Sequence, residues 1–242
     1  MAVVVAHPDD ETIGCGALLS RLDGVSVIVA TDGSPDDLSD AWIAGCATRE
    51  GYAARRALEL EVALGVVGIA PNMVTRLGVR DQHAAFELRT ITDALTRFFV
   101  QRKIEIVLTH AFEGGHPDHD AVAFAADRAT KSTPHQIAVL EMPFYRLGDR
   151  GELRQSFAED RGAVIVPLNE EERARKRRMV AAHRTQARVL AGFSLDSEWF
   201  RVAPEYDFER LPNGGRLLYE LHKWGLSGRE WLACVRAADG AS

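Results

Sequence analysis

The chain has 242 residues, of which 46% are hydrophobic and 26% charged, and this composition is that of a globular protein and excludes a disordered or collagen-like one. The formal net charge of -6 disfavours binding to nucleic acid, because such a chain gains little from counterion release. The three cysteines lie far apart, so neither a disulfide framework nor a cysteine-based zinc site is expected. No apolar run approaches the roughly 18 residues of a membrane span, and the short apolar N-terminus lacks a basic region. We therefore expect a cytoplasmic protein without an integral membrane segment. The sequence does not indicate its oligomeric state.

Short apolar runs alternate with longer segments of helical pattern along most of the chain. Runs this rich in β-branched residues predict strands that are buried on both faces, as in a parallel sheet. We expect strands at 2–6, 25–30, 104–109, 137–141 and 163–166, with a weaker candidate at 73–77. We expect helices at 12–22, 42–64, 84–101, 121–129 and about 170–191. This alternation predicts an α/β fold of Rossmann-like type, in which helices flank a mostly parallel sheet.

The last of these helices has recognisable signals at both ends. Asn169 is a good N-cap, Glu172 stands three residues later as a capping box requires, and Gly192 is typical of a C-terminal end. The residues after it are rich in tryptophan, and no Pro/Gly/Ser-rich linker separates them from the rest. We therefore expect one domain over residues 1–242, with a core of about 1–193 and a C-terminal extension of about 194–242 packed on the sheet.

Polar clusters follow three of the expected strands, at the edge where an open α/β sheet binds its ligands. They are HPDDE at 7–11, TDG at 31–33 and a later cluster at 109–119 that ends in His116-Pro-Asp-His119. Loops that follow parallel strands can meet at one edge of a sheet, so we expect these clusters to share one site.

His7 and Asp10 are candidate ligands of a divalent metal ion. Residues three apart share one face of a helical turn, so this imidazole and this carboxylate can reach one point, and such a pair binds zinc or a similar ion. Asp9 is then left free beside the metal, where a general base is needed. Alternatively, Asp9, Asp10 and Glu11 could only stabilise the positive end of a helix dipole. This alternative does not explain the presence of His7.

His116 and His119 repeat this pattern. Either both bind the metal, or one binds it while the other contacts the substrate; a polar loop with Pro117 in a turn is the alternative. Two histidines and one carboxylate leave open positions for water and substrate, which is typical of a catalytic site. The same donors occur in non-haem iron oxygenases, so the residues alone do not choose the metal.

The motifs AHPDDE at 6–11, TDG at 31–33 and GHPDH at 115–119 together resemble the PIG-L/LmbE-like de-N-acetylases. That family consists of zinc-dependent enzymes that remove acetyl groups from N-acetylated amino sugars. The resemblance extends over roughly residues 1–193 and includes Arg49-Glu50, with a weaker match at Lys176, His183 and Gln186. It implies a metal-dependent de-N-acetylase that binds one Zn2+ per chain, or another divalent metal, and acts on a small amino-sugar substrate.

The resemblance also implies roles for individual residues. Asp9 would be the general base, and His116 would stabilise or protonate the tetrahedral intermediate. Asp118 would not bind the metal itself but would orient one of the histidines through its carboxylate. The ligands of the zinc ion would be His7, Asp10 and His119.

The resemblance also implies contacts with the substrate, with one departure from the pattern of the family. Arg49 and Asp81 match positions that contact the substrate in relatives. Some relatives also carry a tyrosine shortly before the GHPDH motif, where this chain has Gly114-Gly115. His110 or Tyr145 could supply that contact to the substrate.

The motifs thus predict hydrolysis of an N-acetylglucosamine-type amide by water bound to the metal, with Asp9 as the base. Two alternatives stay open, a deacylase of the same fold acting on another secondary metabolite and a metal-binding module without activity. The intact Asp9 speaks against the second. Because aromatic faces stack on sugars, Trp199 or Trp224 could line the mouth of the site, although tryptophans more often pack in a core.

Overall fold

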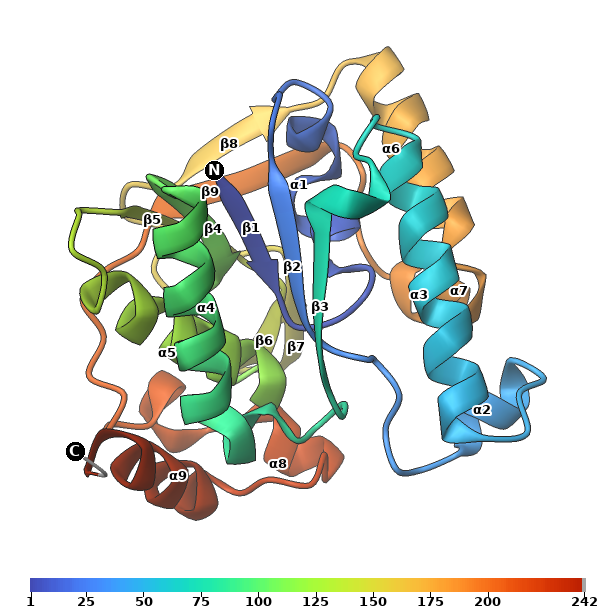
Figure 1. The fold of residues 1–242 in the computed structure, drawn as a ribbon. Coiled ribbons are helices and arrows are strands. Elements are labelled where there is room, and N and C mark those ends of the chain that lie inside the picture. The colour runs from blue at the N-terminus through green and yellow to red at the C-terminus, as the bar shows by residue number, and fades with distance from the viewer. Residues whose placement is uncertain (241–242) are drawn as a thin grey trace.

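The computed structural model describes residues 1–240 and contains a seven-stranded sheet in the order β3-β2-β1-β4-β5-β9-β8 (Figure 1). Five neighbouring strands are parallel: β1 (Ala2–Val5), β2 (Ser26–Thr31), β3 (Val74–Val79), β4 (Ile106–His110) and β5 (Ala138–Met142). An antiparallel edge is added by β9 (Ser197–Val202) and β8 (Val164–Pro167). The predicted α/β fold with a mostly parallel sheet is confirmed.

Helices cover both faces of this sheet. One face packs against α4 (Leu88–Arg102) and α5 (Pro117–Lys131), and α9 (Gly228–Gly240) packs on α4. The other packs against α1 (Asp10–Leu19), α3 (Arg49–Gly65) and α6 (Glu170–Ala182). Successive side chains of a strand point to opposite faces, so β1 places Ala2 and Val4 in one hydrophobic cluster and Val3 and Val5 in the other. A strand buried on both faces therefore needs the unbroken apolar run that the sequence shows.

Shorter elements connect these layers. The short helices are α2 (Ser39–Ile43), α7 (Ala187–Leu190) and α8 (Leu218–His222), and a separate hairpin is formed by β6 (Tyr145–Gly148) and β7 (Gly151–Arg154). Single 3-10 turns lie at Pro71–Met73, Ala84–Glu87, Arg184–Gln186 and Pro212–Gly215. Among residues 1–240, no helix combines the length and apolar character needed to cross a membrane.

Two expected helices are interrupted in the structure. The expected helix at 42–64 is divided into α2 and α3, because Gly45 has a φ of 73° and Thr48 caps α3 by accepting a hydrogen bond from Gly51 N at 3.1 Å. The expected helix at 170–191 ends at Ala182, because His183 has a non-helical ψ of 64°. The capping box of Asn169 and Glu172 at its start is present as predicted.

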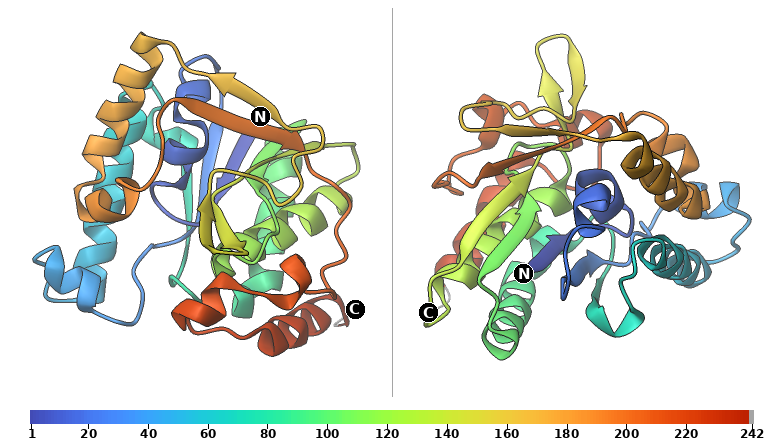
Figure 2. Two further views of the ribbon diagram at one scale, coloured as in Figure 1. Left: turned by 180° about the vertical axis from the view of Figure 1, so that it is seen from behind. Right: turned by 90° about the horizontal axis from the view of Figure 1, so that it is seen from above.

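The C-terminal extension does more than pack on the sheet. It contributes β9, which is inserted between β5 and β8, and β9 was not among the expected strands. Figure 2 shows β8 and β9 crossing the same side of the molecule as α6. Further along, Trp231 of α9 is fully buried, with its ring 5.5 Å from that of Phe112. The extension is therefore joined to both the sheet and the core.

Candidate metal centre and substrate cavity

The loops after β1 and β4 bring three donor side chains together. His7 follows β1, Asp10 begins α1, and His119 lies in the first turn of α5. One ligand atom of each residue lies within 4.8 Å of the other two, and all three residues are buried. His119 Nε2 is 3.3 Å from Asp10 Oδ1, and His7 Nδ1 is 3.2 Å from Asp10 Oδ2. The structure thus brings together the three residues that were expected to hold a metal ion.

These donors fit a divalent metal. His119 Nε2 is buried and has no hydrogen-bond partner within residues 1–240. A buried polar atom without a partner lowers stability, so this nitrogen is suited to a ligand that is bound at the site. Two imidazoles and one carboxylate are ordinary zinc ligands, and they leave coordination positions free.

Asp118 lies behind His7 and fixes its orientation. The carboxylate is fully buried, and its Oδ2 accepts a hydrogen bond from His7 Nε2 at 3.2 Å. It also accepts hydrogen bonds from the backbone N–H groups of Gln82 at 2.6 Å and Ala84 at 3.0 Å. A proton on His7 Nε2 leaves the lone pair of Nδ1 on the side of Asp10, as a metal ligand requires.

Asp9 lies beside these donors on the wall of a cavity. Its Oδ2 accepts a hydrogen bond from Arg56 Nη2 at 3.0 Å, and its backbone N–H donates to Glu11 at 3.0 Å. Burial raises the pKa of Asp9 to about 6, against the opposing effect of the Arg56 charge. A carboxylate with a pKa near neutrality can take up a proton and release it again during a reaction.

His116 presents a hydrogen-bond donor to the same cavity. It is the N-cap of α5, and its Nδ1 accepts a hydrogen bond from the backbone N–H of Asp118 at 3.2 Å. The proton of the neutral ring therefore lies on Nε2, which is 4.0 Å from Asp81 Oδ1. Burial lowers the pKa of His116 well below its usual value, so the neutral form is favoured. The ring packs against Trp224, with 4.9 Å between centroids.

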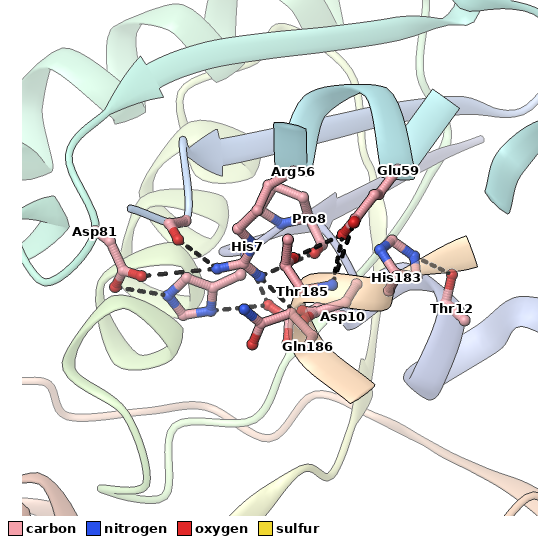
Figure 3. Close-up of polar contacts among 12 residues, drawn as sticks. His7, Pro8, Asp10, Thr12, Arg56, Glu59, Asp81, His183, Thr185 and Gln186 are labelled. Carbon is pink, nitrogen blue, oxygen red and sulfur yellow. Dashed lines mark hydrogen bonds and ion pairs between the residues drawn. The ribbon is translucent and has the colours of Figure 1, made fainter. Parts of the chain in front are cut away.

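On α3, Arg56 rather than Arg49 lines the cavity, which Arg154 and Arg188 also line. Arg49 donates to Asp32 at 2.5 Å and is absent from the described residues that line the cavity. Arg56, seven residues later on α3, is 4% exposed and donates to the Pro8 carbonyl at 3.0 Å (Figure 3). A Cβ at Gly33 would lie 2.3 Å from Arg56 Nη1, so the glycine of the TDG motif makes room for this side chain. Arg56 was not predicted; its spacing from Arg49, which repeats a helix face, could have suggested it.

Of the other two residues expected to contact the substrate, Asp81 lines the cavity and His110 does not. His110 is 1% exposed, accepts a hydrogen bond from Ala6 N–H at 2.8 Å, and stacks on His119 with 4.0 Å between ring centroids. His110 therefore packs against the candidate ligand His119 and does not line the cavity. Asp81 does line the cavity, and its Oδ1 lies 3.4 Å from His7 Nε2 (Figure 3).

The chain has no space for a tyrosine immediately before His116. A Cβ at Gly115 would lie 1.9 Å from the Tyr145 carbonyl oxygen, and Gly114 has a φ of 70°. Tyr145 itself comes from β6 and lines the cavity, with its ring 5.3 Å from that of His119. Of the two side chains considered for this contact, Tyr145 faces the cavity and His110 does not.

The cavity has a volume of about 390 Å³, within the usual range for small-molecule sites. His7, Asp9 and Asp10 lie on its wall, so the candidate metal centre opens into it. Trp224 lines it as well, whereas Trp199 does not.

A model of the PIG-L family, described as GlcNAc-PI de-N-acetylase, matches residues 2–130, which include both histidine motifs. The chain belongs to this family. Its membership confirms that the chain is a hydrolase of the deacetylase type, as the motifs predict.

Solved structures of similar fold include deacetylases. The N,N'-diacetylchitobiose deacetylase from Pyrococcus horikoshii has a TM-score of 0.62 and 18% identity over 84% of this chain and 83% of its own. A zinc-inhibited form of a teicoplanin deacetylase has a TM-score of 0.60 and 17% identity over 83% and 97%. A 4-carboxy-2-hydroxymuconate hydratase from Pseudomonas putida is also similar, with a TM-score of 0.55 and 15% identity over 87% and 98%. At these identities the likeness shows the fold, which carries more than one reaction. A sequence search of curated proteins gives no match.

Proposed function

We propose that the protein is a zinc-dependent hydrolase that removes the acetyl group from an N-acetylated amino sugar or glycoconjugate of the N-acetylglucosamine type. The observation that carries this proposal is the convergence of His7, Asp10 and His119 beside Asp9 at one end of a cavity. Membership of the PIG-L family supports the reaction type, and the structurally similar N,N'-diacetylchitobiose deacetylase supports an amino-sugar substrate. The zinc-inhibited form of a teicoplanin deacetylase supports the binding of zinc by this fold.

The chain's own residues supply the proton transfers. Zinc held by His7, Asp10 and His119 would make water more acidic and polarise the acetyl carbonyl. Asp9 accepts a proton from the attacking water and delivers it to the departing amine. His116 donates a hydrogen bond through Nε2–H to the negative charge that develops on the carbonyl oxygen. The products are acetate and the free amine.

Substitution of Asp9 tests its assignment as the general base. Asp9→Asn is expected to lower kcat by a factor of about 10²–10⁴, because asparagine cannot accept the proton. The release of acetate from a panel of N-acetylglucosamine conjugates measures the effect, and elemental analysis should find unchanged zinc. Asp36→Asn, which removes an exposed carboxylate that pairs with Arg80 and His83, is the matched control. Full activity in Asp9→Asn would refute the role of Asp9.

Removal of a ligand tests the metal centre. His119→Ala is expected to lose zinc, because its Nε2 is one of only three donors in the described cluster around Asp10. A variant with stoichiometric zinc after dialysis would show that the ion is bound elsewhere. If wild-type protein releases acetate from none of the conjugates, the amino-sugar substrate is wrong.

A further inference from the structure

Asp9, the proposed base, is held through its backbone as well as through its carboxylate. Its φ of 143° and ψ of -24° are rare for a residue with a side chain, and such a conformation persists only where the surrounding contacts impose it. The backbone N–H of Asp9 donates to Glu11 Oε2 at 3.0 Å. The orientation of the Glu11 carboxylate, which is fully buried, therefore bears directly on the backbone of Asp9.

The other oxygen of Glu11 is held by a side chain that in turn meets a histidine. Thr12 Oγ1 donates a hydrogen bond to Glu11 Oε1 at 2.6 Å and lies 3.1 Å from His183 Nε2. A hydroxyl group has one hydrogen, so Thr12 Oγ1 accepts from His183, whose proton is thereby assigned to Nε2. The same nitrogen lies 3.5 Å from Glu11 Oε1. These contacts form a network that runs from His183 through Thr12 and Glu11 to the N–H of Asp9.

The histidine reaches this network from a distant and firmly anchored part of the chain. His183 stands 171 residues after Thr12, ends α6 and is 1% exposed. Two residues later, Thr185 donates to Glu59 Oε2 of α3 from its backbone N–H at 3.1 Å and from its hydroxyl at 2.6 Å (Figure 3). A supporting side chain that is itself fixed can hold a reacting group precisely.

We propose that His183 is a positioning residue for the general base: through Thr12 and Glu11, its Nε2–H keeps Asp9 in the strained conformation that presents its carboxylate to the attacking water. This inference rests on the proposed hydrolase function and adds a residue to its machinery. Neither His183 nor Thr12 is among the described residues that line the cavity, so neither is expected to touch the substrate.

Replacement of the histidine tests the proposal. His183→Leu keeps an apolar bulk but removes the donor, and is expected to lower kcat about 10- to 100-fold with little change in KM, because a misplaced base affects the reacting state most. Elemental analysis should find unchanged zinc. His183→Gln, whose amide can donate in place of Nε2–H, should recover most of kcat. His135→Leu is the matched control, since it removes a histidine that contacts the Ile104 carbonyl at 2.8 Å and does not line the cavity.

Substitutions of Thr12 break the same network at a second point, so that a folding defect at position 183 does not decide the outcome. Thr12→Val removes the hydroxyl and should lower kcat as His183→Leu does, whereas Thr12→Ser should not. The double variant Thr12→Val/His183→Leu should be no more than about twofold slower than the slower single variant, because both changes interrupt one network. Two independent effects on folding would multiply instead.

A second readout does not depend on activity. The Asp9 N–H is protected from exchange with solvent by its hydrogen bond to Glu11. Hydrogen exchange measured by NMR on the zinc-loaded full chain should show this amide exchanging about tenfold faster or more in His183→Leu and Thr12→Val. Exchange at Asp9 in His135→Leu should match the wild type.

The outcomes separate this inference from the proposed function. Loss of kcat in His183→Leu, recovery in His183→Gln and a non-additive double variant support the inference. Wild-type kcat in His183→Leu, a loss that multiplies with that of Thr12→Val, or unchanged exchange at Asp9 overturns it and leaves the proposed function standing. If the wild type releases acetate from no conjugate, the proposed function is wrong, and exchange at Asp9 then decides whether His183 holds this residue.

Discussion

The backbone of Asp9 has a φ of 143° and a ψ of -24°, a conformation that a residue with a side chain rarely adopts. Arg56 holds its carboxylate, and Glu11 Oε2 accepts its backbone N–H at 3.0 Å. Glu11 also accepts a hydrogen bond from Thr12 Oγ1, which lies 3.1 Å from His183 Nε2. The strained residue is therefore held by contacts on two sides, and this supports its assignment as the base.

Gly33→Ala is expected to lower kcat about 10- to 100-fold with a smaller change in KM, because misplacement of a catalytic group affects the reacting state most. The new Cβ would lie 2.3 Å from Arg56 Nη1, so the guanidinium must move away from Asp9. Steady-state kinetics on the wild-type substrate measures both constants. Gly24→Ala is the control, because Gly24 also has a positive φ but nothing lies within 4 Å of its Cβ position. Equal effects of the two substitutions would attribute the loss to backbone strain alone.

Arg56→Lys is expected to lower kcat by about tenfold or more, because an ammonium group cannot reproduce the fork with which arginine contacts two acceptors. In this chain Nη2 donates to Asp9 Oδ2 and to the Pro8 carbonyl, each at 3.0 Å, while Nη1 donates to the Gly33 carbonyl. The adjacent Arg55→Lys is the matched control, since Arg55 is exposed on the same helix and does not line the cavity. Steady-state kinetics measures kcat of the two variants. A wild-type kcat in Arg56→Lys would mean that Asp9 is positioned without Arg56.

At the level of elements, the predicted strands of the sheet differ from β9 in how they bury charge. β9 was missed, as were β6 and β7 of the separate hairpin. β1 and β2 are buried apolar runs, so composition alone identifies them. β9 has the sequence SEWFRV, in which Glu198 and Arg201 are only 2% and 9% exposed. Their partners, Lys176 and Glu141, lie on α6 and β5. A strand whose buried positions carry paired charges has no apolar signature, because the pairing depends on residues far away in sequence.

The pair of Lys176 and Glu198 also compensates for a kink in α1. Cys15 has a φ of -147°, which interrupts the helix and frees backbone groups on both sides of it. Glu198 accepts the N–H groups of Ala17 at 2.7 Å and Leu18 at 2.9 Å, while Lys176 Nζ donates to the Ile13 carbonyl at 2.7 Å. One buried ion pair from α6 and β9 thus holds the helix that begins with the candidate metal ligand Asp10.

Lys176→Met is expected to lower the free energy of unfolding by about 3–5 kcal/mol, because it leaves the buried Glu198 charge without its partner. Lys176 is fully buried and 2.7 Å from Glu198. Urea unfolding measures the change. The adjacent Arg177→Met is the control, since it removes an exposed pair with Glu170 and should change stability by less than about 1 kcal/mol. A similar decrease in the free energy of unfolding for both variants would show that the buried pair does not stabilise α1.

At the level of the whole molecule, the metal centre could be predicted and the cavity around it could not. His7, Asp10 and His119 lie in short motifs that directly follow strands, and the topology of a parallel sheet brings such loops together. The cavity wall depends instead on how distant elements pack. Arg49 and Arg56 share one face of α3, and how this helix packs in the folded protein decides that Arg56 rather than Arg49 lines the cavity.

A second buried polar cluster joins the sheet to the C-terminal extension. Glu141 of β5 is 1% exposed and accepts hydrogen bonds from Arg201 Nε at 2.5 Å and Tyr206 Oη at 2.8 Å. Arg201 also lies 3.7 Å from Glu113, in the loop after β4. Burial raises the pKa of Glu141 from 4.5 to about 7, although Arg201 and Tyr206 favour the charged form.

The sign of the resulting pH dependence follows from proton binding. Between pH 4.5 and about 7, the folded chain keeps the proton on Glu141 that the unfolded chain has released. The folded state then binds more protons, so the free energy of unfolding falls as the pH rises through this range and becomes constant above it. A rise of the pKa from 4.5 to about 7 corresponds to a total loss of about 3 kcal/mol from this one group, most of it between pH 5 and pH 8.

Glu141→Gln is expected to abolish this part of the pH dependence, because the amide does not titrate. Urea unfolding of both proteins at pH 5 and pH 8 should show that the wild type loses about 2–3 kcal/mol more than the variant on going to the higher pH. The titrating groups of the metal centre are common to both proteins and cancel in this difference. Glu105→Gln, which removes an exposed carboxylate next to β4, should follow the wild-type curve. If the wild type and Glu141→Gln lose the same amount, Glu141 is ionised in the folded protein throughout this range, and Arg201 outweighs the effect of burial.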